Sequence, residues 1–351
     1  MTTVHVVVPD GIDDPARPSG GNAYDRHICS GLTSIGWSLH EHEVPGRWPR
    51  ADAASFAVLD AVVQHIPDDA IVLLDGLVAS TAPEVLVRQA RRLRLVVLVH
   101  MPLGHRSARD EWMRERAVLA AATAVVTTSA WARRRLLDLY SLPADRVHVA
   151  EPGVAAADLA TGTAAGRALL CVAPVTFDKG HDVLLDALAT VTDLPWHCVC
   201  VGSLDRNTAF VEALRRRSVD GGLDDRVGFP GPRTGADLDR SYAEADLMVL
   251  ASRAETYGMV VTEALARGVP VVATDVGGVA EALGHGPDGI RPGVLLPPDD
   301  PAVLGAALRA WLGDAELRGR LRQAAVERRE SLSGWSTTTS VIAGVLSRAS
   351  Q

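Results

Sequence analysis

Lysine is almost absent from this sequence. Lys179 is the single lysine, and every other member of the 35 Lys and Arg residues is arginine. Such a skew is expected when genomic composition acts on surface charges that are interchangeable. A lysine kept against that bias suggests a site that needs a compact ammonium on a flexible stem, because the planar arginine fork is not equivalent to it. Chance survival of one lysine is the alternative interpretation.

Cysteines and long apolar runs are also scarce. No apolar run reaches the roughly 18 residues that indicate a transmembrane helix. The amino-terminal residues lack the basic region and the small-residue cleavage site of a signal peptide. We therefore expect a reducing, cytoplasmic location. This expectation agrees with the cysteines, which are too few and too irregularly spaced for a disulfide framework: Cys29, Cys171, Cys198 and Cys200.

Two common nucleotide-binding motifs are missing. The sequence contains neither the Gly-x-Gly-x-x-Gly fingerprint of Rossmann dehydrogenases nor the Gly-x-x-x-x-Gly-Lys-Ser/Thr loop of P-loop NTPases, so both classes are disfavoured. The formal net charge of -8 argues against general nucleic-acid binding. We expect no nucleic-acid partner.

The apolar pattern predicts two α/β halves. A chain of 351 residues with 47% hydrophobic content favours two domains. Short apolar runs alternate with helical stretches, which is typical of parallel sheets covered by helices on both faces. The predicted domains are 1–153 and 154–332, followed by a helical segment, 333–351, that packs back on the first domain. The runs predicted as strands are 4–8, 38–44, 70–74, 95–99, 124–128 and 146–150, and then 168–173, 196–201, 226–229, 246–250, 269–274 and 293–296.

Two glutamates surround a predicted helix start in the second half. Glu255 lies in the loop after a strand, and Glu263 lies on the following helix. Tyr257, Gly258 and Met259 stand between them, where free backbone N–H groups and the helix dipole favour an anion. The carboxylates are good acceptors for sugar hydroxyls. The alternative is one acid at a helix N-terminus and one solvated helix acid.

Lys179 precedes a second helix start in the same half. It follows the strand 168–173 and is followed by Gly180. A cation beside a glycine and free N–H groups suits a diphosphate.

His100 and a pair of glycines are the candidates in the first half. His100 follows the strand 95–99, at the edge where open α/β sheets bind ligands. A structural histidine at a strand end is the alternative, and a metal pair with His105 is disfavoured because no third ligand lies nearby. Gly20 and Gly21 follow the first strand and would let the backbone approach a ligand, although a tight surface turn has the same pattern.

These residues resemble the retaining glycosyltransferases of family 4, which have the GT-B arrangement of two Rossmann-like domains facing an interdomain cleft. The Glu-x7-Glu signature is present as Glu255 to Glu263, within a segment that runs from Ala245 to Gly278. Further matching positions are the Gly20-Gly21 loop, His100, the helix start at Ser129, Lys179-Gly180, Val201-Gly202, Val227 to Gly231 and Gly293 to Asp300.

The resemblance implies a role for each candidate residue. Lys179 would neutralise the diphosphate of a nucleotide sugar, His100 would lie near the transferred sugar and Glu255 would bind its hydroxyls, which makes these three the catalytic candidates. Glu263 would hold the ribose. The remaining donor-binding candidates are Gly20, Gly21, Gly202, Arg233, Tyr257, Gly258 and Met259.

The implied activity is transfer of a hexose-like sugar, with retention of configuration, from a nucleoside diphosphate to a hydroxyl acceptor. Such enzymes need no metal and no cofactor beyond the donor substrate, and the leaving diphosphate is thought to take the acceptor's proton. The protein's task is then positioning and charge stabilisation. A non-catalytic nucleotide-sugar-binding subunit or sensor, or a sugar-nucleotide epimerase on the same fold, are the alternatives.

Two features depart from the family pattern. The arginine that usually precedes the lysine by five or six residues is replaced by Ala173 and Pro174, and Arg253 or Arg206 are the candidates to supply that charge. The usual Asn-Gly-Val-Asp turn is Pro152 to Ala155 here.

Two arginine groups in the first half predict weak peripheral contact with anionic membranes, with solvated helix faces as the alternative. They are Arg88, Arg91, Arg92 and Arg94, and Arg133 to Arg135.

Overall fold

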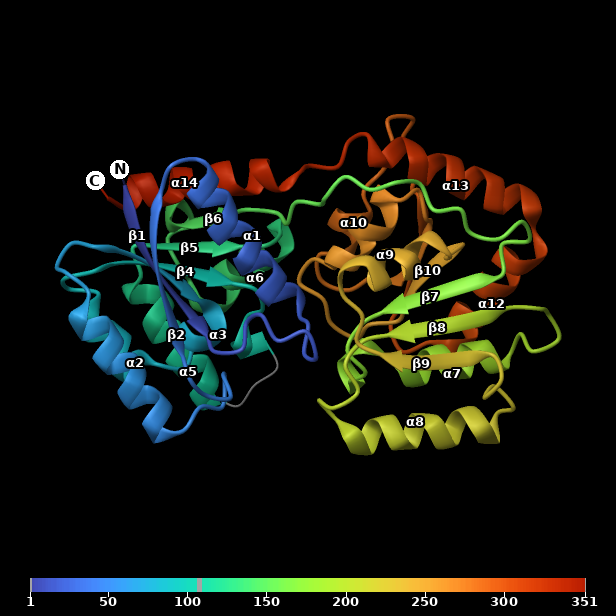
Figure 1. Ribbon diagram of the computed structural model, residues 1–351, viewed down its shortest axis with the longest axis horizontal. Helices are drawn as coiled ribbons and strands as arrows, with labels where there is room; N and C mark the ends of the chain where they lie inside the picture. Colours follow the sequence, from blue (N-terminus) through green and yellow to red (C-terminus); the bar gives the residue numbers. More distant parts are fainter. Residues whose placement is uncertain (1, 106–108, 351) are drawn as a thin grey trace. The chain divides into compact units, whose positions relative to one another are not determined.

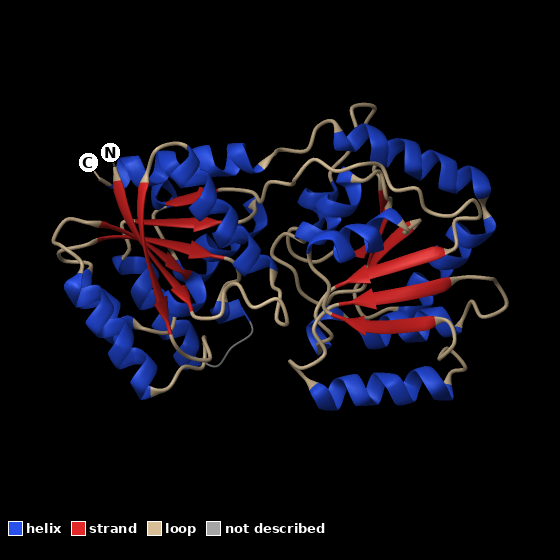
Figure 2. Cartoon of the chain, in the orientation of Figure 1, coloured by secondary structure: helices blue, strands red, loops and turns tan. Residues whose placement is uncertain are grey.

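The computed structural model describes residues 2–105 and 109–350, and these form two compact units. The first unit comprises the chain up to Asp13, Gly20–Gly153 and the chain from Gly334 onwards, and the second comprises Asp14–Ser19 and Val154–Ser333. Each unit is a parallel six-stranded sheet with helices on both faces (Figure 1 and Figure 2). The two Rossmann-like sheets expected from the alternation are therefore present.

The first unit has the strand order β2-β1-β3-β4-β5-β6. Its strands are short and buried, with every residue of β3 and β5 in the interior. The strands are β1 (Thr3–Pro9), β2 (Ser38–Val44), β3 (Ile71–Asp75), β4 (Arg94–Val99), β5 (Ala124–Thr127) and β6 (Val147–Val149). The helices are α1 (Gly20–Ser34), α2 (Ala53–His65), α3 (Gly76–Ala79), α4 (Pro83–Gln89), α5 (Arg109–Ala121), α6 (Ala130–Tyr140) and α14 (Trp335–Ala349).

The second unit has the strand order β12-β11-β10-β7-β8-β9. Its strands are β7 (Ala168–Val172), β8 (His197–Val201), β9 (Val227–Gly231), β10 (Leu247–Leu250), β11 (Val271–Thr274) and β12 (Gly293–Leu296). Its helices are α7 (His181–Ala189), α8 (Thr208–Asp220), α9 (Gly235–Ala243), α10 (Met259–Ala266), α11 (Val279–Leu283), α12 (Pro301–Gly313) and α13 (Ala315–Arg329).

Alternate residues of the central strands enter two separate cores in the second unit. On β7, Leu169 and Cys171 pack in one apolar cluster, while Leu170 packs in the cluster on the other face. Val249 of β10 joins the first cluster and Met248 joins the second. Both faces need apolar side chains, and the strand sequences are therefore continuous apolar runs.

Helix α14 packs against α1 within the first unit. Its first residue, Trp335, stacks on His27 with ring centroids 4.1 Å apart and meets the edge of Tyr24 at 5.4 Å. Gly31 of α1 lies against Thr339 so closely that a Cβ at Gly31 would be 2.2 Å from the threonine hydroxyl. The carboxyl-terminal segment thus belongs to the first unit.

Two local features differ from the sequence predictions. Gly20 and Gly21 were expected in a loop, but they form the first turn of α1. A short helix, α3, follows β3 directly, because the side chain of Asp75 accepts hydrogen bonds from Leu77 N and Val78 N and so caps it. A four-residue helix is too short to show the apolar periodicity on which the prediction depends.

Candidate active site

The second sheet places Lys179 and Glu255 beside each other. Strands β7 and β10 are neighbours, but β7 leads on to β8 on one side and β10 leads on to β11 on the other. The connections therefore leave in opposite directions, and this switch point is where open α/β sheets bind ligands. Lys179 follows the carboxyl end of β7, and Glu255 follows that of β10.

Lys179 and Glu255 form an ion pair. The Nζ atom of Lys179 lies 2.5 Å from Oε1 of Glu255, and Ser252 Oγ donates a hydrogen bond to the same oxygen at 2.9 Å. The lysine side chain is 19% exposed and that of the glutamate 11%, so both remain open to a ligand without being mobile surface groups. A single ammonium is thereby held in place at the switch point.

Arg253 and Gly180 hold the loop that carries Lys179 against the loop that carries Glu255. Arg253 N donates to Asp178 O at 2.8 Å, and the Arg253 guanidinium donates to Phe177 O at 2.6 Å. That guanidinium also lies 3.9 Å over the Phe177 ring. Gly180 has φ +66°, and a Cβ there would be 1.9 Å from Ala251 O. The spacing of the two loops therefore depends on a glycine after the lysine.

Helix α10 begins at Met259, shortly after Glu255 in the chain. Gly258, with φ +94°, occupies the cap position and gives no side-chain hydrogen bond to the first helical N–H groups, which Met259 begins. These N–H groups are suited to an anion. Tyr257, by contrast, is 6% exposed and packs among Leu250 and Val261, so its ring belongs to the core.

A hydrogen bond from Tyr242 orients the carboxylate of Glu263. The tyrosine hydroxyl donates to Glu263 Oε2 at 2.6 Å, and Arg267 lies 4.6 Å over the tyrosine ring. Burial raises the pKa of Glu263, and the hydrogen bond from Tyr242 opposes that rise. The second glutamate of the signature thus has a neighbour different from the first.

Two predicted donor contacts lie at different places. Gly202 immediately follows β8, next to β7, and its backbone packs on Ala173 O. The Arg233 guanidinium donates to Ser241 Oγ at 2.8 Å. Arg233 lines a pocket with Ala168 and His197, which begin β7 and β8 at the end opposite to Lys179. The structure therefore does not bring Arg233 together with Lys179 and Glu255.

The two arginines considered as replacements for the missing cation have other partners. Arg253 forms a two-bond pair with Asp182 at 2.8 and 2.9 Å and a further pair with Asp299 at 2.6 Å. Arg206 donates to the carbonyls of Arg17 and Pro18 at 3.4 and 3.3 Å, and burial lowers its pKa. Both arginines serve loop structure in this conformation.

The first sheet has its own switch point, between β1 and β3. The connection from β1 leads through α1 to β2, and that from β3 leads to β4 on the other side. Asp25 comes from α1, Asp75 ends β3 and His100 follows β4. His100 Nε2 lies 2.8 Å from Asp25 Oδ1 and 3.8 Å from Asp75 Oδ2.

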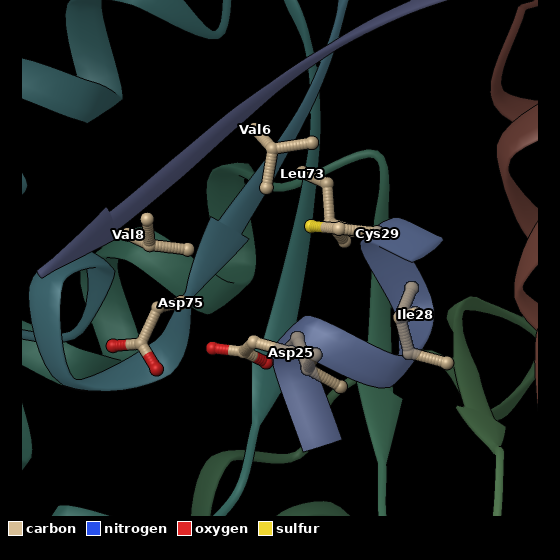
Figure 3. Close-up of a pocket in the computed structure, with 8 residues that line it drawn as sticks. Val6, Val8, Asp25, Ile28, Cys29, Leu73 and Asp75 are labelled. Carbon is tan, nitrogen blue, oxygen red and sulfur yellow. The ribbon is translucent and has the colours of Figure 1, made fainter. Parts of the chain in front are cut away.

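This cluster is nearly closed to solvent. The side chains of Asp25 and Asp75 are each 5% exposed and that of His100 is 14% exposed. The two carboxyl groups turn toward one another beside a small pocket (Figure 3). Apart from the two acids, its lining is apolar or thiol: Val6, Val8, Ile28, Cys29, Leu73 and Leu98.

Burial and neighbouring charges shift the pKa values of Asp75 and His100. Burial, together with the charge of Asp25, raises the pKa of Asp75 to about 7. For His100, burial lowers the pKa but the charge and hydrogen bond of Asp25 and the charge of Asp75 outweigh it, so the pKa is raised. Such perturbation is common at functional sites.

Gly20 and Gly21 lie beside His100. A Cβ on Gly21 would stand 3.3 Å from Cδ2 of the imidazole, so the helix start of α1 packs closely on the ring. Gly20 and Gly21 open that helix and are near the sheet's switch point. Their predicted contact with a diphosphate stays a prediction.

Among the residues that the structure describes, two groups of side chains have ligand atoms close enough together to hold a metal ion. They are Asp25, Asp75 and His100 in the first unit and Cys171, His181 and Cys200 in the second. The second group is fully buried in the apolar core. The expected independence from metals stays a prediction, and the side chain of His105 lies outside the described residues.

The arginine groups considered for membrane contact are largely paired within the unit. Arg88, Arg92 and Arg94 meet Asp60, Asp68 and Asp69, respectively. Arg133 donates to two carbonyl groups, those of Ala144 and Val147, both at 2.8 Å. In the part of the chain that the structure describes, no helix combines the length and apolar character needed to cross a membrane.

Four neighbours of the candidate residues escaped the sequence analysis: Asp25, Asp75, Tyr242 and Ser252. Asp25 stands 75 positions before His100, so spacing alone gives no hint that they pair. Asp75 directly follows the run 70–74 that the sequence predicts as a strand. An aspartate at the carboxyl end of a central strand is nevertheless a signal that could have marked it as a site residue.

Two Rossmann-like units, each with polar groups at its switch point, define the GT-B class of transferase fold. The chain superimposes over 99% of its length on sucrose-phosphate synthase from Thermosynechococcus elongatus, covering 99% of that chain, with a TM-score of 0.80 and 20% identity. It likewise matches HepE from Anabaena, crystallised with UDP-glucose, over 99% of this chain and 100% of that one, with a TM-score of 0.79 and 19% identity.

The sequence itself identifies the family. The profile described as Glycosyltransferase Family 4 matches residues 3–158, and that described as Glycosyl transferases group 1 matches residues 166–314. The chain belongs to glycosyltransferase family 4.

Curated relatives agree with this assignment. The D-inositol 3-phosphate glycosyltransferase of Jonesia denitrificans is 32% identical over 65% of this chain and 58% of its own length. That of Kineococcus radiotolerans is 34% identical over 68% and 60%, respectively. The mannosylfructose-phosphate synthase of Agrobacterium fabrum is 31% identical over 48% and 38%. The chain thus spans less than two thirds of the length of these relatives.

Proposed function

We propose that this protein is a retaining glycosyltransferase that moves a hexose-like sugar from a nucleoside diphosphate to a hydroxyl acceptor without a metal ion. The observation that carries the proposal is the ion pair of Lys179 with Glu255 at the switch point of the second sheet. A lysine that is partly buried, beside free helical N–H groups, suits a diphosphate.

Each residue has a distinct task in this proposal. Lys179 leaves Glu255 to neutralise the diphosphate, which frees the Glu255 carboxylate for sugar hydroxyls. The N–H groups at Gly258 and Met259 contact the phosphates, and Glu263 accepts the ribose hydroxyls. His100 is assigned to the transferred sugar. Charge that develops on the leaving diphosphate is stabilised by groups already in place, which is the main way such a site lowers the barrier.

The names of the relatives guide the choice of acceptor. Inositol 3-phosphate glycosyltransferases and mannosylfructose-phosphate synthase are among them. Phosphorylated polyols and sugar phosphates therefore come first in an acceptor panel, together with unphosphorylated polyols as controls.

The test is a product assay. Purified protein is incubated with UDP-, GDP- and ADP-sugars and each acceptor in the presence of EDTA, and nucleoside diphosphate release is measured. Proton NMR of the product then gives the anomeric configuration. The proposal predicts acceptor-dependent release, a product with the donor's configuration and no loss of rate in EDTA. An inverted product would contradict retention.

A second candidate is a nucleotide-sugar-binding protein that does not transfer. It is favoured by the absence of the usual arginine at Ala173 and Pro174 and by the engagement of Arg253 with Asp182 and Asp299. Calorimetry that shows donor binding, with no donor consumed across the whole acceptor panel, would support this candidate over the first.

A further inference from the structure

We propose that Asp25 is a positioning residue for His100: it accepts the Nε2–H of the imidazole and so presents Nδ1 to a hydroxyl of the transferred sugar. This inference rests on the proposed function only in assigning His100 to the sugar. Asp25 carries no part of the donor signature, and it stands 75 residues from His100 in the sequence.

The first argument is the geometry of the hydrogen bond. The distance of 2.8 Å from His100 Nε2 to Asp25 Oδ1 is that of a charge-assisted bond, whereas the 3.8 Å to Asp75 Oδ2 is too long for one. One ring nitrogen is therefore committed to Asp25. The nitrogen through which His100 can meet a substrate is Nδ1.

The second argument is that the ring is held on its other sides. The close approach of Gly21 limits movement toward α1, and Tyr24 meets the ring edge-on with centroids 5.2 Å apart. Tyr24 is itself fixed, because it is buried and its hydroxyl donates to Ala150 O at 2.8 Å. A clamped imidazole with one assigned nitrogen has a defined tautomer and direction.

The third argument is the energetic cost of the arrangement. Two aspartates, each 5% exposed, face one another beside a pocket whose other lining is apolar or thiol (Figure 3). The His100 imidazole lies 2.8 Å from one of these carboxylates and 3.8 Å from the other. Buried ion pairs of this kind are rarely the most stable choice, since apolar residues of similar volume do as well or better. A stabilising role alone would thus not explain Asp25, whereas orientation of a functional histidine does.

Asp75 has a different part in the cluster. One of its oxygens, Oδ1, accepts from Leu77 N at 2.8 Å and Val78 N at 3.1 Å, which fixes the carboxyl group as the cap of α3. Its other oxygen faces the histidine at a distance where charge acts but no hydrogen bond forms. The titrating groups that face His100 are accordingly Asp25 from α1, Asp75 from β3 and Tyr24 from α1.

The test is ¹⁵N and ¹H NMR of His100 in the wild-type protein, in Asp25→Asn and in Asp75→Asn. In wild type we expect Nε2 to carry the proton in the neutral ring. Asp25→Asn should lower the pKa of His100 by about one unit or more, because an opposite charge in contact is lost. Asp75→Asn should lower it by less and leave the tautomer unchanged. Asp10→Asn, an exposed acid after β1, is the matched control and should change neither.

Kinetics separate positioning from mere stabilisation. Asp25→Asn should reduce kcat by roughly 10- to 100-fold, with donor KM within about twofold, because the loss falls on an oriented group and not on diphosphate binding. The limb of the pH–rate profile that His100 governs should move to lower pH. Asp75→Asn should move it less.

Three results would overturn the inference. They are a wild-type tautomer with the proton on Nδ1, an unchanged His100 pKa in folded Asp25→Asn, or site-specific broadening of the His100 signals by equimolar Mn²⁺, which would make the cluster a metal site. The wild-type tautomer decides the matter even if Asp25→Asn does not fold. If the protein proves not to be a transferase, the kinetic readout disappears but the NMR result still tests the pairing.

Discussion

The two glutamates of the signature differ in what surrounds them. One oxygen of Glu255, Oε1, accepts hydrogen bonds from both the Lys179 ammonium and the Ser252 hydroxyl. Glu263 accepts a hydrogen bond from the Tyr242 hydroxyl, and burial raises its pKa. These different surroundings fit the separate tasks that we propose for the two residues, Glu255 at the hydroxyls of the transferred sugar and Glu263 at the ribose.

Replacement of Tyr242 by phenylalanine should weaken donor binding. It removes the 2.6 Å hydrogen bond that orients Glu263. A hydrogen bond to a charged group contributes about 1.5–3 kcal/mol, so we expect donor KM to rise roughly 10-fold or more with little change in kcat. Steady-state kinetics with saturating acceptor measure this.

The matched control is Tyr140→Phe in the first unit. The Tyr140 hydroxyl also donates to a buried carboxylate, that of Glu115, but far from the glutamate signature in the sequence. The Tyr140→Phe variant should lower the free energy of unfolding without raising donor KM. An equal rise in KM for both variants would contradict the role of Tyr242.

Asp75 should make the stability of the first unit depend on pH. Its pKa is raised from 3.8 to about 7, so between these values the folded state binds a proton that the unfolded state releases. Stability contributed by the protonated carboxyl is fully present below about pH 4 and is lost as the pH rises through 7. The raised pKa of His100 acts in the same direction.

Asp75→Asn should flatten this dependence. We expect wild type to lose protection of β3 and β4 amides between about pH 4 and 7 and the variant to lose less, as measured by hydrogen exchange corrected for its intrinsic pH dependence. Since the variant still titrates at His100, some slope should remain. A slope as steep as that of wild type would show that Asp75 is already ionised in the folded protein.

At the level of elements, glycines set how closely the site loops approach. Gly277 follows β11 with φ +60°, and a Cβ there would be 1.5 Å from Glu255 O. The loop after β11 thus supports the backbone of the glutamate loop. The support is backbone to backbone and tolerates no side chain.

Gly277→Ala should therefore displace Glu255. A left-handed backbone costs an alanine about 1–2 kcal/mol, and the clash adds to it, so we expect kcat/KM to fall at least roughly 10-fold together with a lower Tm. Gly319→Ala in α13 is the control. Its Cβ meets nothing within 4 Å, and alanine in a helix interior should stabilise by about 0.5–1 kcal/mol without affecting kcat/KM.

The strands and helices could be predicted from the sequence, but the contacts between side chains on different strands could not. Continuous apolar runs such as that of β7 mark buried parallel strands, and their order along the chain indicated two sheets. Lys179 and Glu255 were both found because each follows a strand. The sequence did not predict the direct contact between them, because that contact depends on β10 pairing with β7. Lys179 and Glu255 are 76 positions apart in the chain. The cluster around His100 was missed for the same reason.

At the scale of the whole molecule, both units are parallel six-stranded sheets with charged side chains at the switch point, but the charges differ. The second unit has a cation beside one carboxylate at its switch point, and the first has two carboxylates around one histidine. We expect the charge of a diphosphate to be neutralised in the second unit, because a cation attracts an anion whereas two buried acids repel one.

Binding of a nucleoside diphosphate should therefore protect the two units unequally. At 100 times its dissociation constant a ligand stabilises the native state by about 2.7 kcal/mol. We expect hydrogen exchange with and without UDP, GDP or ADP to slow most in peptides that span 177–181 and 252–263. Protection confined to the first unit would place the diphosphate elsewhere.

The most direct test of the account is calorimetric titration of the preferred nucleoside diphosphate into wild type and Lys179→Ala. Because the ammonium is partly buried and hydrogen-bonded to Glu255, its loss should raise Kd roughly 30-fold or more. Arg309→Ala, which removes an exposed cation paired with Asp193, should leave Kd unchanged. Equal affinity in wild type and Lys179→Ala would contradict the assignment of the single lysine to the diphosphate.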